Sequence, residues 1–303
     1  MARVTVVHNT EAGDDAIDEK ELLSLLKQAG FRPDYHSTRG SSWEKALEHP
    51  ADLVVVAGGD GTIAKVARRL AGRGVPMAIL PAGTANNIAR TLGLCREPRT
   101  LISEWAHARA TPVDLGIARG PMGERIFLEA AGVGVFAQLM MEGERSIDPA
   151  GLPGREEIAY AIELLRRLAR NTAPTACTIV ADGITMSGNH LAVEVMNIRS
   201  IGPQIRLAPD ADPRDGLFDV ITVRDAEREE LERILDTSTP GEVIVAPFTC
   251  TRARDVEISW DRGPAHVDDD LWPESGAGED AMPEPGPASM RATVLPGALA
   301  VLL

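Results

Sequence analysis

Two glycine-rich turns, each placed directly after a short apolar run, constrain the fold of this chain more than any other feature. The run Leu53–Ala57 leads into Gly58-Gly59-Asp60-Gly61-Thr62, and the run Met77–Leu80 leads into Pro81-Ala82-Gly83-Thr84. Continuous apolar runs of this length are typical of central parallel strands, which are covered on both faces. A helical pattern follows each turn, so the segment up to about residue 95 predicts alternating strands and helices and a parallel sheet.

The chemistry of these turns favours phosphate binding. Glycines at a strand-to-helix turn let backbone N–H groups approach a phosphate closely, and the start of the helix faces its charge. Thr62 and Thr84 add hydroxyl donors. One such turn is equally well explained as a tight turn with a threonine cap, but two on successive strands favour a phosphate site. Neither turn has the GxxxxGK[ST] or GxGxxG pattern, so backbone amides and a metal ion would hold the nucleotide.

Strand patterns dominate from about residue 112 onward. Only Arg155–Arg170 and Ala226–Leu235 have convincing helical spacing there. A β-rich segment after an α/β segment indicates a second domain. We expect an N-terminal domain of residues 1–118, completed by a last strand at about 292–303, and a β-rich domain of residues 119–291. The acidic, proline-rich segment 273–289 is expected to be an insertion in the second domain. The predicted strands are Val113–Ala118, Ile126–Gly132, Cys177–Ala181, Leu191–Ile198, Phe218–Val223, Val243–Phe248 and Val256–Trp260.

Charge is distributed unevenly between these two parts. Residues 1–118 carry 14 basic and 14 acidic side chains, whereas residues 119–303 carry 17 and 31. This acidic surplus argues against a nucleic-acid interface and provides no polybasic patch for anionic lipids. The three cysteines have no metal-binding spacing, and no apolar stretch is typical of a signal peptide or a membrane span. The sequence therefore predicts a soluble, cytoplasmic protein.

The motifs resemble, in order along nearly the whole chain, the diacylglycerol kinase catalytic-domain family. That family includes bacterial lipid kinases, is related to sphingosine and ceramide kinases, and is more distantly related to NAD kinases. The resemblance implies α/β + β architecture: a doubly wound, Rossmann-like parallel-sheet domain and a C-terminal β-sandwich-like domain. The matching segments are LVVVAGGDGTIAKVA (53–67), PAGTANNIARTLGL (81–94), PVDLG (112–116), FLEAAGVGVFA (127–137), DGLFDV (215–220) and LPGAL (295–299).

In that family the glycine turns bind the ATP phosphates at an interdomain cleft. Asp60 has a second expected role, in orienting the acceptor or the metal, because the matching residue of NAD kinases is the suggested base. Ala64 and Lys65 stand where the family has Asn-Glu, and Asn87 stands where it has Asp. Carried over by motif, the nucleotide contacts are Gly58, Gly59, Asp60, Gly61, Thr62, Gly83 and Thr84, with Asn9 and Thr38 as further candidates.

The run Asp268-Asp269-Asp270 stands where the family has Asp-Gly-Glu, the motif of its catalytic base. Phosphoryl transfer to an alcohol needs a carboxylate to accept the hydroxyl proton. Asp268 and Asp270 are both candidates, because alternate residues at a strand end point to one face. Without the resemblance, three successive aspartates would be interpreted as a solvated acidic turn.

The loop from Asp212 to Leu217 matches the family's structural metal loop. The resemblance implies that Asp212, Asp215 and the carbonyl of Leu217 bind Mg²⁺, and oxygen donors suit this ion. A β-turn with Asp-Gly at its corner explains the same residues equally well.

The prediction is an ATP-dependent lipid kinase that phosphorylates a hydroxyl of a diacylglycerol-like or related lipid, with ATP and Mg²⁺. Two alternatives stay open: a kinase of a soluble alcohol or nucleotide, as in NAD kinases, and a catalytically impaired nucleotide-binding regulator. The helix at 155–170 is either a lid near a membrane surface or, more ordinarily, a surface helix packed on a sheet. Expected partners are a lipid with a free hydroxyl, a transient membrane contact and a second copy of the chain, but no nucleic acid.

Overall fold

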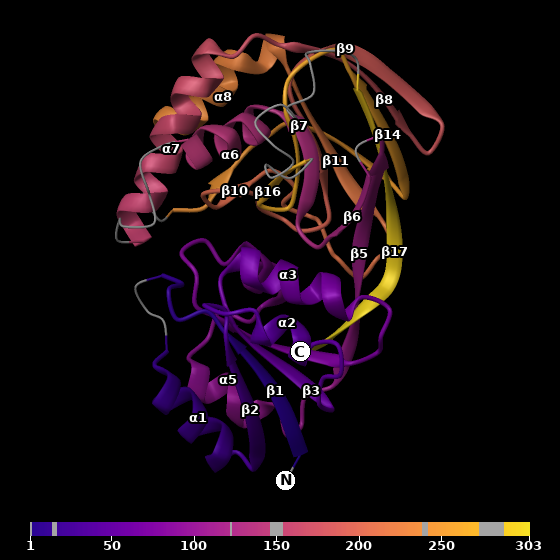
Figure 1. Ribbon diagram of the computed structural model, residues 1–303. Coiled ribbons are helices and arrows are strands. Elements are labelled where there is room, and N and C mark those ends of the chain that lie inside the picture. The colour runs from indigo at the N-terminus through magenta and orange to yellow at the C-terminus, as the bar shows by residue number, and fades with distance from the viewer. Residues whose placement is uncertain (1, 14–16, 122, 146–153, 238–241, 273–287) are drawn as a thin grey trace. The chain divides into compact units, whose positions relative to one another are not determined.

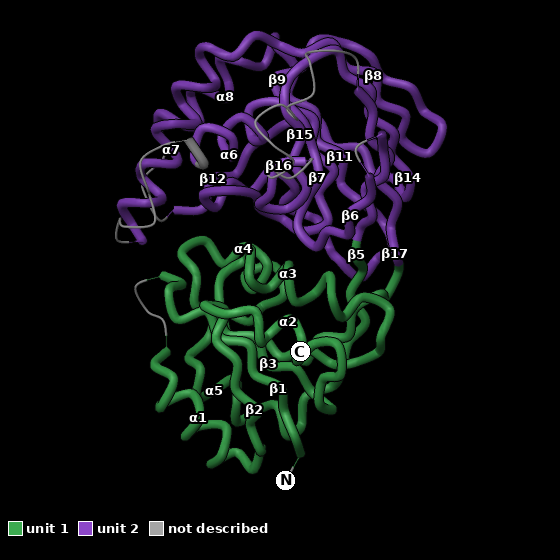
Figure 2. The backbone as a smooth tube through the Cα atoms, viewed as in Figure 1, with its two compact units in different colours: residues 1–115, 296–303 green, residues 116–295 purple. Residues whose placement is uncertain are grey.

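The computed structural model describes residues 2–13, 17–121, 123–145, 154–237, 242–272 and 288–303. The chain forms two compact units, residues 1–115 with 296–303 (unit 1) and residues 116–295 (unit 2) (Figure 2). Two strands, β5 (Ala110–Gly120) and β17 (Ala288–Leu302), run from one unit into the other. Most of the predicted insertion 273–289 lies outside the described residues, and its last two residues already belong to β17.

Unit 1 is built on a parallel sheet with the strand order β17-β4-β3-β1-β2. Figure 1 labels β1, β2 and β3 of this sheet. The central strand β3 is buried along its whole length, as its continuous apolar run predicts. The strands are β1 (Ala2–His8), β2 (Phe31–Ser37), β3 (Leu53–Gly58) and β4 (Pro76–Pro81), joined at the sheet edge by the end of β17. The helices are α1 (Glu19–Gln28), α2 (Ser42–Ala46), α3 (Asp60–Leu70), α4 (Asn87–Leu92) and α5 (Pro98–Glu104).

Unit 2 is mainly antiparallel β structure. Its longest internal strand, β9, pairs with β8 through its first half and with both β7 and β11 through its second half. The strands are β6 (Gly123–Phe127), β7 (Ala130–Gly134), β8 (Thr175–Ala181), β9 (Ile184–Met196), β10 (Ile205–Arg206), β11 (Phe218–Arg224), β12 (Ile244–Val245), β13 (Thr249–Ala253), β14 (Asp255–Trp260), β15 (Ala265–Val267) and β16 (Asp270–Trp272). The helices are α6 (Val135–Arg145), α7 (Gly154–Asn171) and α8 (Arg228–Asp236), with a short 3-10 turn before α8. The parallel N-terminal sheet and the β-rich second unit confirm the predicted fold class.

Helix α7 packs as a surface helix. Ile158, Ile162 and Leu165 lie in a buried core that also contains residues of β9 and β11. On its outer side, Arg167 is paired with Glu142 of α6 at 3.5 Å, and Arg170 with Asp236 of α8 at 2.8 Å. The ordinary interpretation of this helix therefore agrees with its contacts.

Three sequence-based expectations for unit 2 are wrong in detail. Of the strand expected at Val243–Phe248, only the two residues of β12 form a strand. A helix that the sequence pattern did not predict, α6, follows β7 directly. The strand ends at Gly134, which has φ 101°, and the helix begins at the next residue. Both segments are apolar at this point, so the sequence pattern does not show where the strand ends and the helix begins. The single strand expected at Ile126–Gly132 is two strands, β6 and β7, which are separated at Leu128 and Glu129. The N–H groups of these two residues bond to a side chain instead of a neighbouring strand. Across the described ranges, no helix has both the length and the apolar character needed to cross a membrane.

Candidate functional site

Parallel pairing brings the carboxyl ends of four strands to one edge of the unit 1 sheet, where ligands bind in open α/β folds. His8, the last residue of β1, pairs with Ser37 of β2 and Ala57 of β3. The pairing continues past the strands, because Asn9 N–H donates to Ala57 O at 2.8 Å and Thr38 N–H donates to His8 O at 3.0 Å. The predicted nucleotide residues that follow these strands therefore share one edge.

The two glycine turns touch each other. A Cβ atom on Gly83 would lie 2.4 Å from the Cα of Gly59, and a Cβ on Gly59 would lie 3.1 Å from the Cα of Gly83. A Cβ on Gly58 would lie 2.8 Å from the Cβ of Thr62. The turns thus pack backbone against backbone, which only glycine permits at this separation. This packing explains the glycines independently of any phosphate.

Asp60 joins the two turns. It is the first residue of α3, and its carboxylate accepts hydrogen bonds from the N–H groups of Asn87 at 2.9 Å and Ile88 at 3.0 Å. Both donors belong to the first turn of α4, where N–H groups have no acceptor inside the helix. Asp60 therefore caps α4 from the neighbouring turn, a favourable place for a negative charge.

The second turn has already used several of its donors. Asn86, with φ 52°, accepts a hydrogen bond from Gly83 N–H at 3.0 Å and donates to Gly83 O at 2.6 Å. In the first turn, Asn9 Nδ2 donates to Thr62 Oγ1 at 3.3 Å. The first hydrogen bond within α3 runs from Ile63 N–H to Gly59 O. The N–H groups of Gly61 and Thr62 come before it and therefore have no acceptor within the helix. The first turn is thus the better phosphate cradle.

In unit 2, Asp268 is a buried bracing residue. It is 2% exposed, has φ 52°, and forms with Asp269 the two-residue turn between β15 and β16. Its Oδ1 accepts hydrogen bonds from Leu128 N–H at 3.1 Å and Glu129 N–H at 2.7 Å, and its own N–H donates to Ala130 O at 2.7 Å. These bonds fix the turn to the chain between β6 and β7.

Asp270 differs from Asp268 in access. Its side chain is 30% exposed, and one carboxylate oxygen lies 3.5 Å from Nη1 of Arg125, which is 15% exposed. Asp269, between the two, is exposed. Of the two predicted base candidates, Asp270 is the one that a substrate can reach.

Sequence reasoning missed a group of charged residues around this turn. Glu129 and Glu194 are both buried, and His266 is fully buried against Glu194, although its sequence spacing gave no sign of a role. The available signal was a single acid inside an apolar run, as in LAVEVM (191–196). Such a residue must find a partner because an unpaired buried charge is costly.

The predicted metal loop has suitable donors, and arginine occupies them. Asp212 is bonded by Arg214 Nε at 2.7 Å, and this contact lowers the pKa of the Asp212 carboxyl. Asp215 is paired with Arg252 and also accepts a hydrogen bond from Leu217 N–H at 3.0 Å. Within the described part of the chain, no three His, Cys, Asp or Glu side chains are grouped closely enough to hold a metal. Carboxylate and carbonyl oxygens are the kind of ligand that Mg²⁺ prefers. The guanidinium groups of Arg214 and Arg252 now lie beside these carboxylates, which shows that a positive charge is favourable there.

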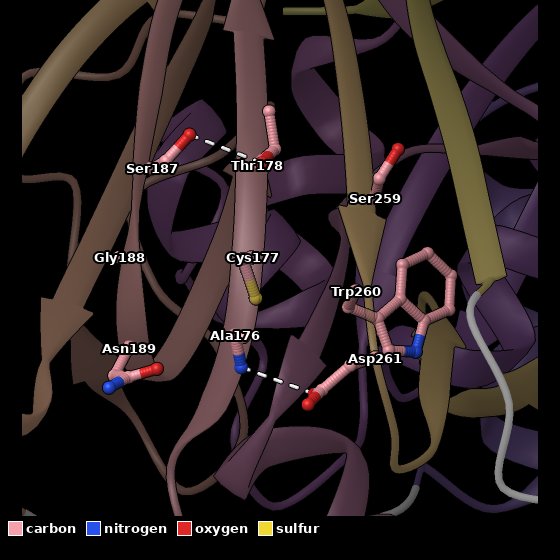
Figure 3. A pocket seen from close by; sticks show the side chains of 9 residues that line it. All are labelled: Ala176, Cys177, Thr178, Ser187, Gly188, Asn189, Ser259, Trp260 and Asp261. Carbon is pink, nitrogen blue, oxygen red and sulfur yellow. Dashed lines mark hydrogen bonds between the residues drawn. The ribbon is translucent and has the colours of Figure 1, made fainter.

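A shallow groove of about 350 Å³ lies on another part of unit 2 (Figure 3). Residues of β8, β9 and β14 line it, among them Cys177, Ser187 and Trp260. Its hydrogen bonds, Thr178 to Ser187 and Ala176 N–H to Asp261, are contacts between neighbouring strands. The predicted site residues do not line this groove.

Comparison with protein families decides the relationship. Residues 3–118 match the family model described as "Diacylglycerol kinase catalytic domain", and residues 142–303 match "YegS C-terminal NAD kinase beta sandwich-like domain". The second match alone spans more than half of the chain. The chain belongs to the diacylglycerol kinase family. The predicted relationship is confirmed, and the protein is a kinase.

Individual members of the diacylglycerol kinase family show the same relationship. The chain is 28% identical over 254 residues to a diacylglycerol kinase of Bacillus subtilis, covering 80% of this chain and 81% of that protein. It is 30% identical over 217 residues to a diacylglycerol kinase of Mycobacterium tuberculosis, covering 70% and 68%. A crystal structure of a diacylglycerol kinase from Bacillus anthracis superposes with a TM-score of 0.66 at 18% identity, covering 99% and 96%, and supports the fold.

Proposed function

We propose that this kinase transfers the γ-phosphoryl group of ATP to a hydroxyl of a diacylglycerol-like lipid. The observation that carries the nucleotide part is the start of α3 at the carboxyl edge of the sheet, where the N–H groups of Gly61 and Thr62 precede the first hydrogen bond of the helix. Relatives named diacylglycerol kinases support a lipid acceptor.

The ATP phosphates would bind at the first turn. The amides of Gly61 and Thr62 precede the helical ladder of α3, and an anion there is also favoured by the helix dipole. Gly58, Gly59 and the Thr62 hydroxyl complete the cradle, while Thr84, Asn9 and Thr38 lie along the same edge. Gly83 and Asp60 hold the two turns together and so act on the shape of the cradle.

We assign the general base to Asp270. Its carboxylate would accept the proton of the lipid hydroxyl while that oxygen bonds to the γ-phosphorus, and the bond to the β–γ bridging oxygen breaks to release ADP. Asp268 would hold the turn in place.

Asp212, Asp215 and the Leu217 carbonyl are the residues that would hold Mg²⁺ as a structural ion of their loop. Mg²⁺ supplies positive charge, there or on the ATP phosphates. Its binding requires Arg214 and Arg252 to release the carboxylates, so we expect millimolar Mg²⁺ to raise the Tm by a few degrees in wild type and not in Asp215→Asn. An equal rise in both proteins would reject the loop as the site.

Contact with the membrane that contains the lipid would depend on apolar surface, because residues 119–303 carry the whole acidic surplus. The homodimer and the cytoplasmic location stay predictions. Sedimentation of the purified chain would test the first.

The deciding experiment is phosphoryl transfer from γ-labelled ATP to diacylglycerol in mixed micelles with Mg²⁺. We expect label in the lipid, and none when the β,γ-imido analogue of ATP replaces ATP. Label in a soluble alcohol or nucleotide but in no lipid would support the alternative of a soluble acceptor. Tight ATP binding without transfer to any acceptor would instead indicate a regulator.

A further inference from the structure

A buried glutamate–histidine pair, Glu194 and His266, contacts the backbone of Asp268. Glu194 Oε2 and His266 Nε2 are 2.8 Å apart, and both side chains are 0% exposed. Their strands, β9 and β15, are not neighbours, because β7 runs between them. The residue of β7 in register with both is Gly132, where a Cβ would lie 2.1 Å from Glu194 Oε2. The missing side chain of Gly132 thus provides the space in which the two side chains meet across a strand.

The other ring nitrogen of His266 holds the backbone of Asp268. Nδ1 lies 2.9 Å from the carbonyl oxygen of Asp268, and because a carbonyl only accepts, Nδ1 carries the proton. The contact between Nε2 and Glu194 then shares one further proton. Burial raises the pKa of Glu194. Burial lowers the pKa of His266, but the neighbouring Glu194 carboxylate raises this pKa by more, so it lies above its usual value. The ring is held at both nitrogens wherever that proton resides.

Asp268 needs this support. A residue other than glycine at φ 52° is in an unfavourable backbone region, although the first residue of a two-residue hairpin turn must adopt it. The carboxylate and N–H of Asp268 are bound by the chain at 128–130, whereas His266 binds its carbonyl. That carbonyl belongs to the peptide that leads to Asp269 and Asp270. The pair therefore acts on the part of the turn that directs Asp270.

We propose that Glu194 and His266 form a positioning pair, which fixes the peptide between Asp268 and Asp269 and thereby aims the carboxylate of Asp270. The inference rests on the proposed function, in which Asp270 accepts the hydroxyl proton. A base displaced by about 1 Å costs on the order of 100-fold in rate, so a pair that touches no substrate can still control turnover.

Two substitutions separate the two hydrogen bonds of the ring. His266→Asn places an amide N–H near the position of Nδ1 and retains the bond to the Asp268 carbonyl, whereas His266→Gln places it near Nε2 and retains the bond to Glu194. We expect His266→Gln to lower kcat about 30-fold with KM for ATP changed less than twofold, and His266→Asn to lower kcat only about threefold. Equal kcat in the two variants, per folded molecule, would overturn the proposal, because a merely structural histidine would not distinguish them.

A second pair of variants keeps the test decisive if His266→Gln does not fold. Glu194→Gln can donate to Nε2 and is expected to retain kcat within about threefold, whereas Glu194→Ala frees the ring and is expected to lower it about 10-fold or more. Full kcat in folded Glu194→Ala would contradict the positioning role.

Hydrogen exchange separates failure of this inference from failure of the proposed function. The amides of Leu128 and Glu129 bond to Asp268, so a loosened turn exposes them whether or not the protein phosphorylates a lipid. We expect their exchange to be at least 10-fold faster in His266→Gln than in His266→Asn. If wild type phosphorylates no lipid, this difference in exchange would still support the positioning role of Glu194 and His266, and only the lipid assignment would fail. Equal exchange in the two variants would reject the positioning role.

Discussion

Each unit contains an aspartate whose carboxylate accepts hydrogen bonds from two successive backbone N–H groups, and the two differ in their surroundings. Asp60 is partly exposed at the carboxyl edge of a parallel sheet and caps α4. Asp268 is 2% exposed and braces a hairpin turn against the break between β6 and β7. The same bonding pattern therefore shapes a ligand edge in unit 1 and an interior support in unit 2.

This difference separates chemistry from support in the acidic turn. If Asp268 is an interior brace, proton transfer must depend on its neighbour Asp270. We expect Asp270→Asn to lower kcat by about 10³-fold, which corresponds to about 4 kcal/mol, because the amide cannot accept the hydroxyl proton. The measurement is kcat with saturating ATP and diacylglycerol, alongside urea unfolding to show that the variant is folded.

Asp269→Asn is the matched control for Asp270→Asn, since it removes the same charge from the same turn at an exposed position. Its kcat should lie within about twofold of wild type. A variant Asp270→Asn with wild-type kcat would show that the base lies elsewhere.

The brace itself is tested by the stability of two alanine variants. Asp268→Ala leaves the N–H groups of Leu128 and Glu129 without their acceptor in the interior, so we expect a loss of about 3 kcal/mol in the free energy of unfolding. Asp60→Ala removes a helix cap beside solvent, and the loss should be about 1 kcal/mol. Urea unfolding at one pH compares them, and equal losses would remove the distinction between the two aspartates.

The ligand edge is tested at the contact between the glycine turns. Gly83→Ala forces the turns apart, because its Cβ would lie 2.4 Å from the Cα of Gly59. We expect the Kd for ATP to rise about 10-fold, or about 1.4 kcal/mol, in isothermal titration. Gly40→Ala, where a Cβ meets nothing within 4 Å, is the control and should bind like wild type. Unchanged affinity in Gly83→Ala would place the nucleotide away from this edge.

A third aspartate, Asp219 of unit 2, is also buried, and its replacement is expected to have the smallest effect of the variants considered. Asp219 is 3% exposed and accepts a hydrogen bond from the Cys250 thiol, a weak donor, and burial raises the pKa of its carboxyl. A raised pKa favours the protonated form, so this group stabilises the fold at low pH and the benefit is lost as pH rises through the folded-state value. Asp219→Asn should therefore be more stable than wild type at pH 7, and this gain should shrink as the pH falls and the wild-type carboxyl becomes protonated. A gain independent of pH in urea unfolding would contradict this cause.

The nucleotide edge was predictable from sequence because its determinants are local. Strand, glycine turn and helix follow one another along the chain, and parallel pairing then places Asn9, Thr38 and the two turns at one edge. The fold class, the family and the kinase activity were confirmed, whereas the roles of the individual residues stay predictions. Lys65, which stands where the family has Glu, is exposed on α3, while Ala64 beside it is buried.

The acidic turn was less predictable because its partners come from distant strands. Asp268 and Asp270 are equivalent in the sequence pattern, and only the amides 140 residues away distinguish them. In the same way, the loop pattern around Asp215 gives no sign that Arg252 of β13 pairs with it. Local patterns therefore locate such carboxylates but not the groups that bind them.

The course of β17 has a consequence for how the protein is made. Unit 1 needs residues 296–303 beside β4, yet these residues leave the ribosome only after all of unit 2 has been synthesised. Until then β4 presents an unpaired strand edge, which is open to pairing with other chains. The newly made chain therefore passes through a stage in which its nucleotide-binding sheet is incomplete, and shortening the chain before Pro296 would make that stage permanent.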